Sequence, residues 1–440
     1  MLCICMMHHY NYISEKIISK RKIESAYIFM KTIGIIAEFN PFHTGHLHLI
    51  EACKKDLNAD HVVIVMSGDF VQRGYPSFCD KYTRTQMALS CGADIVFELP
   101  VCYSTGSAEF FAKGAVSLLN RLGCIDYLCF GSECGSVDLL TSIADILEKE
   151  PANYKETLQK ELKSGFSYAG ARQKALLAYI SSANTPYNKK DVENAFLSPN
   201  NILGIEYIKA LISSASPIQP YSIKRVGQDY SSDLFTEYSS ASAIRSYIST
   251  NGITDNLSLT MPETCIKILR NNADSIRNPG KLSALLGYKL ILEKDNGFDR
   301  FLDINTDLSN KIIANIENYA DFDSFCQLLK SKDLAYSRIS RCLIHILLDI
   351  TKDDMDEYKS KGYISPLRIL GMKKSASSLV KRMNALTDNK ILINLKNASK
   401  ILSDDEQEIL KKNLSSSEIY GLICSRVPVN EYKLKQLITN

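Results

Sequence analysis

Between residues 31 and 130, short apolar runs alternate with amphipathic stretches. Runs without a polar face suit strands that are buried on both sides of a parallel sheet. The stretches between them repeat apolar residues at helical spacing, which predicts one helix after each strand. The predicted strands are Ile33–Ala37, His61–Met66, Asp94–Leu99 and Tyr127–Phe130, and the predicted helices are His46–Lys55, Tyr82–Ser90 and Ala108–Leu122. This alternation predicts an α/β fold built on a doubly wound parallel sheet.

The pattern after residue 136 is mostly helical, with one further predicted strand, Ile218–Arg225, and a polar linker over Ser182–Lys190. Past about residue 258 it contains no convincing strand, so we place a domain boundary there. The first domain then spans residues 30–257, and the second, residues 258–440, is predicted to be mainly α-helical. The helices predicted before the boundary are Val137–Glu148, Tyr154–Leu162, Gly170–Ile180, Ile202–Ile212 and Ser240–Ser249.

Residues 1–29 look foreign to the rest of the chain, because they are rich in Ile, Lys, Tyr and Met without a steady period. Met30 stands directly before the first convincing strand. We expect translation to start at Met30 and the leader to be disordered or not native. The intact mass of the native protein tests this expectation, and a chain that begins at Met1 would contradict it.

The composition is that of an ordinary soluble globular protein, with 45% hydrophobic and 23% charged residues among 440. No apolar run approaches the ~18 residues that a transmembrane helix needs, so no membrane association is predicted. The 13 cysteines are scattered without paired CxxC spacing. This usage favours reduced, packed thiols in a cytoplasmic protein over disulfides or a zinc site.

The segment Glu38–His46 follows the first predicted strand and opens the next helix. Three of the seven histidines, His43, His46 and His48, fall within it or just after it. At a helix start, a spacing of three places His43 and His46 near one face, beside free N–H groups and the positive end of the helix dipole. Gly45 leaves room for a nucleotide to approach the backbone. The segment, which we call the histidine turn, is therefore predicted to bind phosphate.

Such a turn suits in-line attack of an oxygen nucleophile on the α-phosphate of ATP, with pyrophosphate leaving. Positioning and charge stabilisation carry a step of this kind. We therefore predict that His43 and His46 stabilise charge and do not act as general bases. The simpler alternatives are that both side chains only cap the helix or bind a metal ion.

His43-Thr44-Gly45-His46 matches the HxGH signature of the nucleotidyltransferase superfamily, which implies a Rossmann-like sheet. Together with four further segments in fixed order, it resembles the bacterial tRNA(Met) cytidine acetate ligase family from about Lys31 nearly to the C-terminus. The HxGH signature alone is moderately specific, whereas the ordered set is highly specific. The further segments are Met66–Gly74 (MSGDFVQRG), Glu98–Pro100 (ELP), Phe130–Glu133 (FGSE) and Pro199–Gly204 (PNNILG).

The resemblance implies an enzyme that uses ATP to activate acetate as acetyl-adenylate. It then implies transfer of the acetyl group to N4 of the wobble cytidine of elongator tRNA(Met), which forms N4-acetylcytidine. An anticodon base already lies in a single-stranded loop, so presenting it to an enzyme costs little free energy. Mg²⁺ is expected as a second cofactor, because it neutralises the triphosphate.

The resemblance also implies site residues, with His43 and His46 as the catalytic pair. Further nucleotide contacts map onto Gly131, Asn200 and Arg225, and Ser239–Arg245 resembles the superfamily's second phosphate-contacting motif. Where the family often has Tyr-His-Asp, residues 230–233 read YSSD, so no role for a histidine is carried over there. The family's ATP-binding stretch maps onto Ile36, Ala37, Glu38, Phe39, Asn40, Pro41, Phe42, His43, Thr44, Gly45, His46, Leu47, His48 and Leu49.

Without the family, the isolated residues have plainer interpretations. Arg225 ends a predicted strand, where its guanidinium could hold a phosphate or carboxylate, or form a surface salt bridge. Asn200 follows a proline and could cap the next helix, and Gly131 could merely end a strand.

Five further charged residues follow the second predicted strand. Arg73, Lys81 and Arg84 could neutralise phosphate, accept tRNA or be solvated surface charges. Asp69 and Asp80 could assist Mg²⁺, but we leave them out of the catalytic set, because lone aspartates usually cap helices or bond within turns.

The second half contains a basic stretch over residues 361–400, with a single acidic residue, Asp388. A local excess of this kind is the footprint expected for a phosphate backbone, although charge runs are often only solvated. Upstream, Arg338, Arg341 and His345 share one face of a predicted helix, which fits either RNA contact or pairing with a neighbouring helix. We therefore predict that residues 258–440 bind tRNA. The basic residues of the stretch are Lys361, Arg368, Lys373, Lys374, Lys381, Arg382, Lys390, Lys396 and Lys400.

These features favour an ATP-dependent tRNA-modifying ligase, with elongator tRNA(Met) and acetate as partners and no protein partner implied. A nucleotidyltransferase that moves AMP onto a small phosphate ester or nucleotide would use the histidine turn equally well, but it needs no basic helical extension. A third alternative is an RNA-binding or regulatory protein that holds ATP without turnover.

Overall fold

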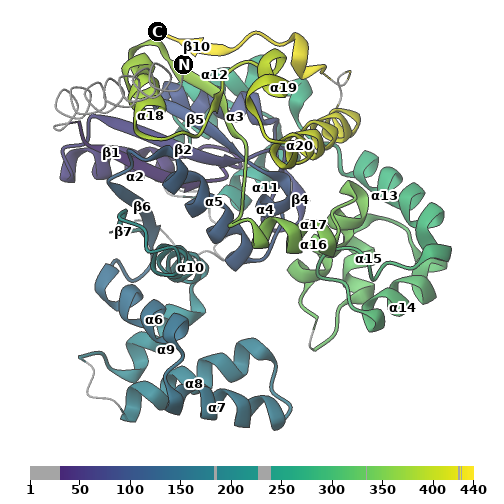
Figure 1. Ribbon diagram of the computed structural model, residues 1–440. Coiled ribbons are helices and arrows are strands. Elements are labelled where there is room, and N and C mark those ends of the chain that lie inside the picture. Colours follow the sequence, from purple (N-terminus) through teal and green to yellow (C-terminus); the bar gives the residue numbers. More distant parts are fainter. Residues whose placement is uncertain (1–29, 183–185, 226–238, 333, 425–426, 428) are drawn as a thin grey trace, which may run out of the picture.

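A computed structural model describes residues 30–182, 186–225, 239–332, 334–424, 427 and 429–440. In it, helices cover both faces of a central sheet, and two helical lobes project away from that sheet (Figure 1). The leader over residues 1–29 and the YSSD segment lie outside the described residues, so the expectations about them stay predictions.

The strands of the sheet are β1 (Thr32–Ala37), β2 (His61–Ser67), β5 (Ile95–Leu99), β6 (Tyr127–Ser132), β7 (Gln219–Lys224), β8 (Leu367–Lys373), β9 (Ile391–Leu392) and β10 (Leu437–Thr439). They follow the order β10-β8-β5-β2-β1-β6-β7, with β9 beside β8. β1, β2, β5, β6 and β7 are parallel, as predicted, whereas β8 pairs with β5 antiparallel. The chain builds the sheet outward from β1 in both directions, so its switch point lies between β1 and β6.

All helices predicted before residue 258 are confirmed within a few residues. Two short helices, α4 and α9, were missed; α9 begins inside the predicted linker. The helices are α2 (Thr44–Asp56), α3 (Lys81–Ser90), α4 (Val101–Ser104), α5 (Ala108–Leu122), α6 (Val137–Lys149), α7 (Ala152–Lys163), α8 (Tyr168–Ser182), α9 (Lys189–Leu197), α10 (Pro199–Ser213), α11 (Ala241–Asn251), α12 (Glu263–Asn271), α13 (Pro279–Glu293), α14 (Thr306–Asn315), α15 (Phe322–Leu329), α16 (Tyr336–Leu348), α17 (Lys352–Ser360), α18 (Ser377–Leu386), α19 (Ala398–Ile401) and α20 (Asp404–Ile423).

Each central strand is apolar on both faces, which explains the unbroken apolar runs. In β2, Val62 and Ile64 pack in one cluster with α2 and α3, while Val63 and Val65 pack in the other with α5 and α10. Alternate side chains of a strand point to opposite faces, so a run without polar positions requires cover on both sides.

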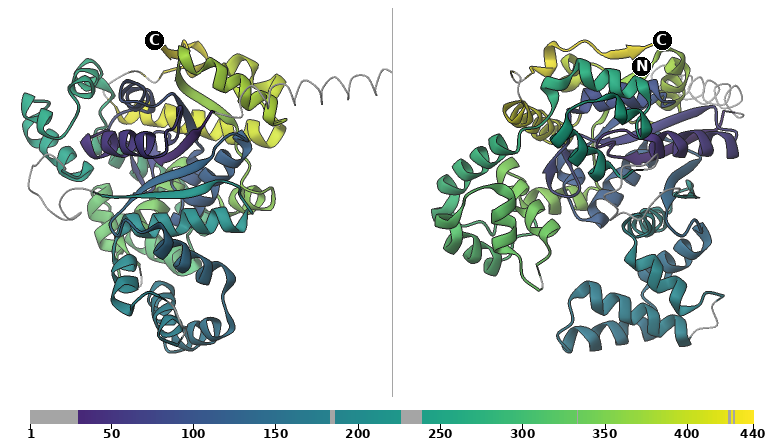
Figure 2. Two further views of the ribbon diagram at one scale, coloured as in Figure 1. Left: turned by 90° about the vertical axis from the view of Figure 1, so that its left-hand side faces the viewer. Right: turned by 180° about the vertical axis from the view of Figure 1, so that it is seen from behind.

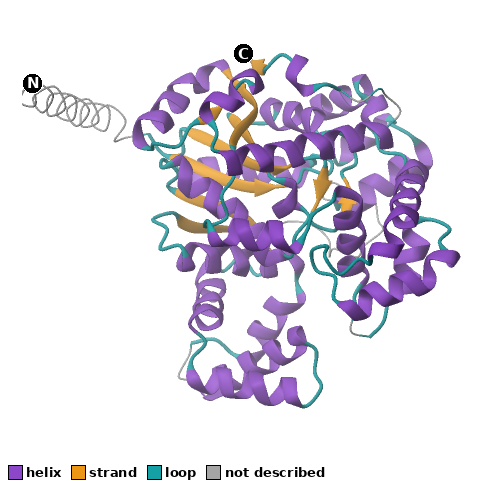
Figure 3. Ribbon diagram, turned by 45° about the vertical axis from the view of Figure 1, so that its right-hand side comes forward, coloured by secondary structure: helices purple, strands orange, loops and turns teal. Residues whose placement is uncertain are grey.

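The helical lobes are α6–α9 and α13–α17, and Figure 2 shows from two further sides that they extend in different directions. Figure 3 shows that the lobes are built of helices, while the strands of the sheet lie together in the body of the molecule. The region after residue 258 is mainly helical, as predicted. The expectation that it contains no strand is wrong, because β8 and β10 extend the sheet beyond β5. The boundary near residue 258 stays a prediction.

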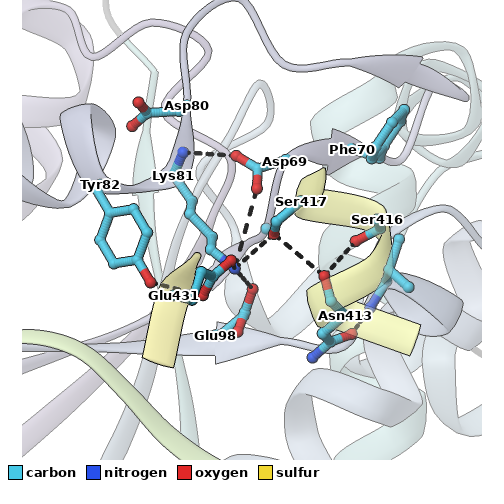
Figure 4. A network of polar contacts seen from close by, with 12 residues as sticks. Asp69, Phe70, Asp80, Lys81, Tyr82, Glu98, Asn413, Ser416, Ser417 and Glu431 are labelled. Carbon is cyan, nitrogen blue, oxygen red and sulfur yellow. Dashed lines mark hydrogen bonds and ion pairs between the residues drawn. The ribbon is translucent and has the colours of Figure 1, made fainter. Parts of the chain in front are cut away.

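A buried network of charges fastens these C-terminal elements to the sheet (Figure 4). Lys81 of α3 lies 2.6 Å from Glu98 of β5 and 2.9 Å from Glu431, which follows α20. Arg368 of β8 pairs with the same two carboxylates and is buried, with 4% of its surface exposed. The Tyr82 hydroxyl donates to Glu431 at 2.6 Å. Two cations and two carboxylates thus meet where α3, β5, β8 and the C-terminal segment join.

Within the described part of the chain, no helix is both long and apolar enough to cross a membrane. The eleven cysteines of that part are free thiols, ten of them buried. The same residues contain no group of three or more His, Cys, Asp or Glu side chains that could hold a metal ion.

Candidate nucleotide-binding site

The two histidines of the histidine turn stack on each other where β1 leads into α2. Their ring centroids are 3.7 Å apart, with the planes inclined by 27°. His43 is the N-cap residue of α2, and its Nδ1 accepts a hydrogen bond from the backbone N–H of Gly45 at 3.1 Å. The backbone N–H of His43 in turn donates to Nδ1 of His46 at 3.2 Å. This reciprocal capping box holds both rings at the helix start.

Both imidazoles are neutral at physiological pH. Burial, together with the charges of Arg225 and Arg245, lowers the pKa of His43 to about 3. Burial, followed by the charges of His43 and Arg225, lowers the pKa of His46 well below its usual value. Because Nδ1 of each neutral ring accepts a hydrogen bond, the ring proton must sit on Nε2. The pair can therefore stabilise an anion by hydrogen-bond donation, while positive charge must come from other residues.

The backbone N–H groups at the start of α2 are already engaged. That of Thr44 donates to the Thr260 carbonyl at 2.9 Å, and that of Gly45 donates to His43. The N–H of His46 donates to the His43 carbonyl at 2.9 Å. The prediction of free N–H groups here is wrong, because the capping side chain and Thr260 occupy the groups that a helix start usually leaves open. Side chains must therefore do most of the anion binding.

Two arginines fix the backbone of the histidine turn. Arg84 of α3 is fully buried and donates to the carbonyls of Glu38 at 2.7 Å and Ser67 at 3.0 Å, beyond β1 and at the end of β2. Arg245 of α11 donates to the Asn40 carbonyl at 2.7 Å. Burial lowers the pKa of Arg245 to about 10, which leaves it charged at neutral pH. The turn is thus tied to β2 and α11 through its own carbonyls.

Part of the predicted ATP-binding stretch faces the core. Phe39 and Phe42 are buried, and their ring centroids lie 5.0 and 5.5 Å from that of His46. The Asn40 side chain accepts a hydrogen bond from the backbone N–H of Phe78 at 2.6 Å. These side chains hold His46 and the turn in place. His48 lies two positions beyond His46 and so points away from the stacked pair.

Gly131, Arg225 and Asn200 come together at the carboxyl ends of β6 and β7. The backbone N–H of Arg225 donates to the Ser132 carbonyl at 2.9 Å, and a Cβ at Gly131 would lie only 3.1 Å from Cγ of Arg225. The Asn200 amide donates to Glu133 at 2.6 Å, so it does not cap its own helix. Glu133 was not among the predicted site residues, although it ends the FGSE segment that could have indicated it.

This cluster lies close enough to the histidine turn for Arg225 to lower the pKa of both His43 and His46. The structure therefore brings the predicted residues together at the switch point between β1 and β6. In doubly wound sheets this is where ligands bind.

Lys81 and Arg84 lie elsewhere than predicted. Both are fully buried, Lys81 against Glu98 and Arg84 against backbone carbonyls, so neither is a phosphate ligand or a solvated surface charge. Asp69 accepts the backbone N–H of Lys81 at 2.8 Å, and Asp80 caps α3, which agrees with their exclusion from the catalytic set.

The polar stripe predicted on α16 is not a basic surface. His345 is fully buried, with its ring nitrogens 3.0 Å from the carbonyls of Leu302 and Thr105. Arg341 lies 3.8 Å from the Asp303 carboxylate. Arg341 thus pairs with an acidic residue, although Asp303 lies outside the helices, whereas His345 binds backbone carbonyls and no acidic side chain of a neighbouring helix.

The basic stretch over residues 361–400 does not form one surface either. Arg368 lies in the buried network, and Lys361 pairs with Asp405 at 2.7 Å. Arg382 donates to the Met30 carbonyl at 2.6 Å, which places α18 at the amino end of β1. A six-residue strand spans roughly 20 Å, so α18 is about that far from the histidine turn. The exposed lysines of the stretch are Lys361, Lys374, Lys381, Lys390, Lys396 and Lys400.

Comparison with known proteins gives this geometry a context. The chain matches the HIGH Nucleotidyl Transferase family over residues 30–436. It is 39% identical over 413 residues to the tRNA(Met) cytidine acetate ligase of Clostridium perfringens, which covers 93% of this chain and 100% of that protein. The protein of the same name from Acetivibrio thermocellus is 37% identical over 410 residues, covering 91% of this chain and 96% of that protein.

Solved structures agree with these relatives. Thermotoga maritima TmcAL bound with alpha-thio ATP superimposes with a TM-score of 0.85 at 28% sequence identity, covering 93% of this chain and 100% of that chain. Its apo form gives a TM-score of 0.86 at the same 28% identity. The chain is therefore a member of the tRNA(Met) cytidine acetate ligase family, within the HIGH nucleotidyl transferases.

Proposed function

We propose that this protein is an ATP-dependent ligase that activates acetate as acetyl-adenylate and transfers the acetyl group to N4 of the wobble cytidine of elongator tRNA(Met). Family membership supports the activity. The observation that carries the assignment of the site is the stacked, neutral pair His43 and His46 at the switch point of the sheet, within range of Arg225 and Arg245.

In the first step, a carboxylate oxygen of acetate attacks the α-phosphorus of ATP, and the bond from that phosphorus to pyrophosphate breaks. Negative charge develops on the phosphoryl oxygens. The Nε2–H groups of His43 and His46 would donate to those oxygens, and Arg225 and Arg245 would supply the positive charge that neutral imidazoles lack. No proton has to be removed from the nucleophile, so no general base is needed.

In the second step, the exocyclic amine of cytidine attacks the acetyl carbonyl, and AMP leaves with the electron pair of the broken C–O bond. The amine loses one proton. Mg²⁺ is expected to enter with ATP, held mainly by phosphate oxygens and water, as this ion usually is in nucleotide sites. It would neutralise the triphosphate when bound. An enzyme of this kind works where tRNA is, in the cytoplasm.

We assign tRNA binding to residues 258–440. The exposed lysines at Lys374, Lys396 and Lys400 support this assignment, since dispersed cations suit a long phosphate backbone. The buried residues of the basic stretch and of α16 take no part in it.

Exchange of radiolabelled pyrophosphate into ATP tests the first step without tRNA. We expect exchange only when acetate is present, followed by N4-acetylcytidine at the wobble position when elongator tRNA(Met) is added. Nucleoside mass spectrometry detects that product. Exchange that ignores acetate but needs a phosphate ester or nucleotide would support the AMP-transferring alternative. Tight ATP binding without any exchange would support the non-enzymatic one.

A further inference from the structure

The β3–β4 hairpin, formed by Phe70–Val71 and Tyr75–Pro76, carries Arg73 at its tip. The backbone N–H of Gln72 donates to the Glu38 carboxylate at 2.7 Å, which attaches the hairpin to the histidine turn. On the other side of Arg73, the Gly74 carbonyl accepts a hydrogen bond from the Ser340 hydroxyl of α16 at 2.6 Å. The tip is therefore fastened on both sides of an exposed arginine.

Gly74 shows how closely the tip is held against α16. Its φ of +73° lies in the left-handed region, and a Cβ there would come within 2.3 Å of the backbone nitrogen of Arg341. Only glycine adopts this φ readily and also leaves room for the Arg341 backbone. The backbone beneath Arg73 is thus preorganised, which is the condition under which a surface side chain binds a small ligand without a large ordering cost.

Arg73 belongs to the charge distribution of the nucleotide site. The Glu38 carboxylate feels the charges of Arg73, Arg84 and Arg245, and Arg245 also acts on His43. The charges of three cations therefore act on the carboxylate of Glu38, the first residue of the histidine turn. The excess of positive charge favours an anion at this position.

The position of the hairpin in the sheet indicates which anionic reactant would lie beside Arg73. Gly131, Asn200 and Arg225 lie on the β6–β7 side of β1, and the histidines stand at the end of β1 itself. The hairpin leaves β2, which is the neighbour of β1 on the opposite side. With strands about 4.8 Å apart, the end of β2 is roughly 10 Å from that of β6. The hairpin therefore lies on the side of the histidine turn away from the predicted nucleotide contacts.

The geometry points to Arg73 as the residue that binds the carboxylate of acetate for attack on the α-phosphate, an inference that rests on the proposed function. A guanidinium forks onto a carboxylate with two parallel N–H bonds, so it fixes both distance and plane. One acetate oxygen then forms the new bond to phosphorus while the bond to pyrophosphate breaks. The arginine stays charged throughout and exchanges no proton.

Acetate-dependent pyrophosphate exchange without tRNA tests this assignment with Arg73→Ala and Arg73→Gln. We expect KM for acetate to rise about 30-fold in both variants, because a charge-assisted pair is lost, with KM for ATP changed less than about twofold. Guanidinium ion added to Arg73→Ala should restore part of the acetate affinity. The control is Arg270→Ala, which removes an exposed arginine of α12 that pairs with Asp255 and should leave both KM values unchanged.

Three outcomes would overturn the assignment. A parallel rise in KM for ATP would place Arg73 on a phosphate, and a loss of tRNA affinity with unchanged KM for acetate would place it on RNA. If KM for acetate and tRNA affinity were both unchanged, Arg73 would bind neither substrate. Failure of the proposed function looks different, because the unaltered protein itself would then show no acetate-dependent exchange.

Discussion

His46→Ala is expected to lower the rate of acetyl-adenylate formation about 10³-fold, since removal of one preorganised donor from a developing oxyanion typically costs 10²–10³. The variant removes an Nε2–H donor and the Nδ1 acceptor that caps the backbone N–H of His43. It also removes a ring that packs against both Phe39 and Phe42. Single-turnover formation of acetyl-adenylate measures the effect, and tRNA affinity should be nearly unchanged.

A second substitution, at the same position, separates loss of the Nε2–H donor from loss of the acceptor that caps the His43 N–H. His46→Asn keeps an amide oxygen that can accept from the His43 N–H, so its thermal unfolding midpoint should lie closer to that of the unaltered protein than the midpoint of His46→Ala does. Its adenylation rate should stay low, because the amide is too short to reach the Nε2 position. The matched control is His61→Ala, in the first residue of β2 at the opposite, amino-terminal end of the parallel strands. Unchanged acetyl transfer by His46→Ala would refute the assigned role.

Arg368→Met is expected to reduce the free energy of unfolding by about 3–5 kcal/mol, the usual effect of removing one partner from a buried ion pair. Arg368 lies 2.7 Å from Glu98 and also pairs with Glu431 (Figure 4 shows these carboxylates around Lys81). Without it, the single charge of Lys81 faces the buried carboxylates of Glu98 and Glu431 together with that of Asp69 at 4.0 Å. Urea unfolding monitored by circular dichroism measures the loss.

Two further variants test whether the loss of stability comes from the buried network. Arg368→Met combined with Glu431→Gln should recover part of the loss, because one carboxylate fewer is then left uncompensated. Lys390→Met, which removes an exposed cation from the same basic stretch, should change the free energy by less than about 0.5 kcal/mol. A loss below about 1 kcal/mol for Arg368→Met would mean that the network is solvated and does not fasten β8 to the sheet.

The N-terminal half of the fold was predictable because its signals are local. Each strand is a continuous apolar run, and the histidine turn joins a strand to a helix within a few residues. β8 was missed for the opposite reason. Arg368 and Gly371 interrupt its apolar character, and its place in the sheet depends on pairing with β5, which lies some 270 residues earlier.

The predicted surroundings of charged residues were wrong where their partners are distant in the chain. Arg368 and Lys81 belong to one buried network although 287 positions separate them, and the His345 ring binds the Thr105 carbonyl 240 positions away. A count of charges along the sequence cannot reveal such partners. The same limit explains why the histidine turn was predicted with free N–H groups, since Thr260, which occupies one of them, lies far along the chain.

A crystal structure with a non-hydrolysable ATP analogue tests the central claim most directly. We expect Nε2 of His43 and of His46 each to lie about 2.7–3.1 Å from a phosphate oxygen, with Arg225 or Arg245 beside the same phosphates. A triphosphate bound away from the histidine turn, or held there with neither Nε2 atom in contact, would contradict it.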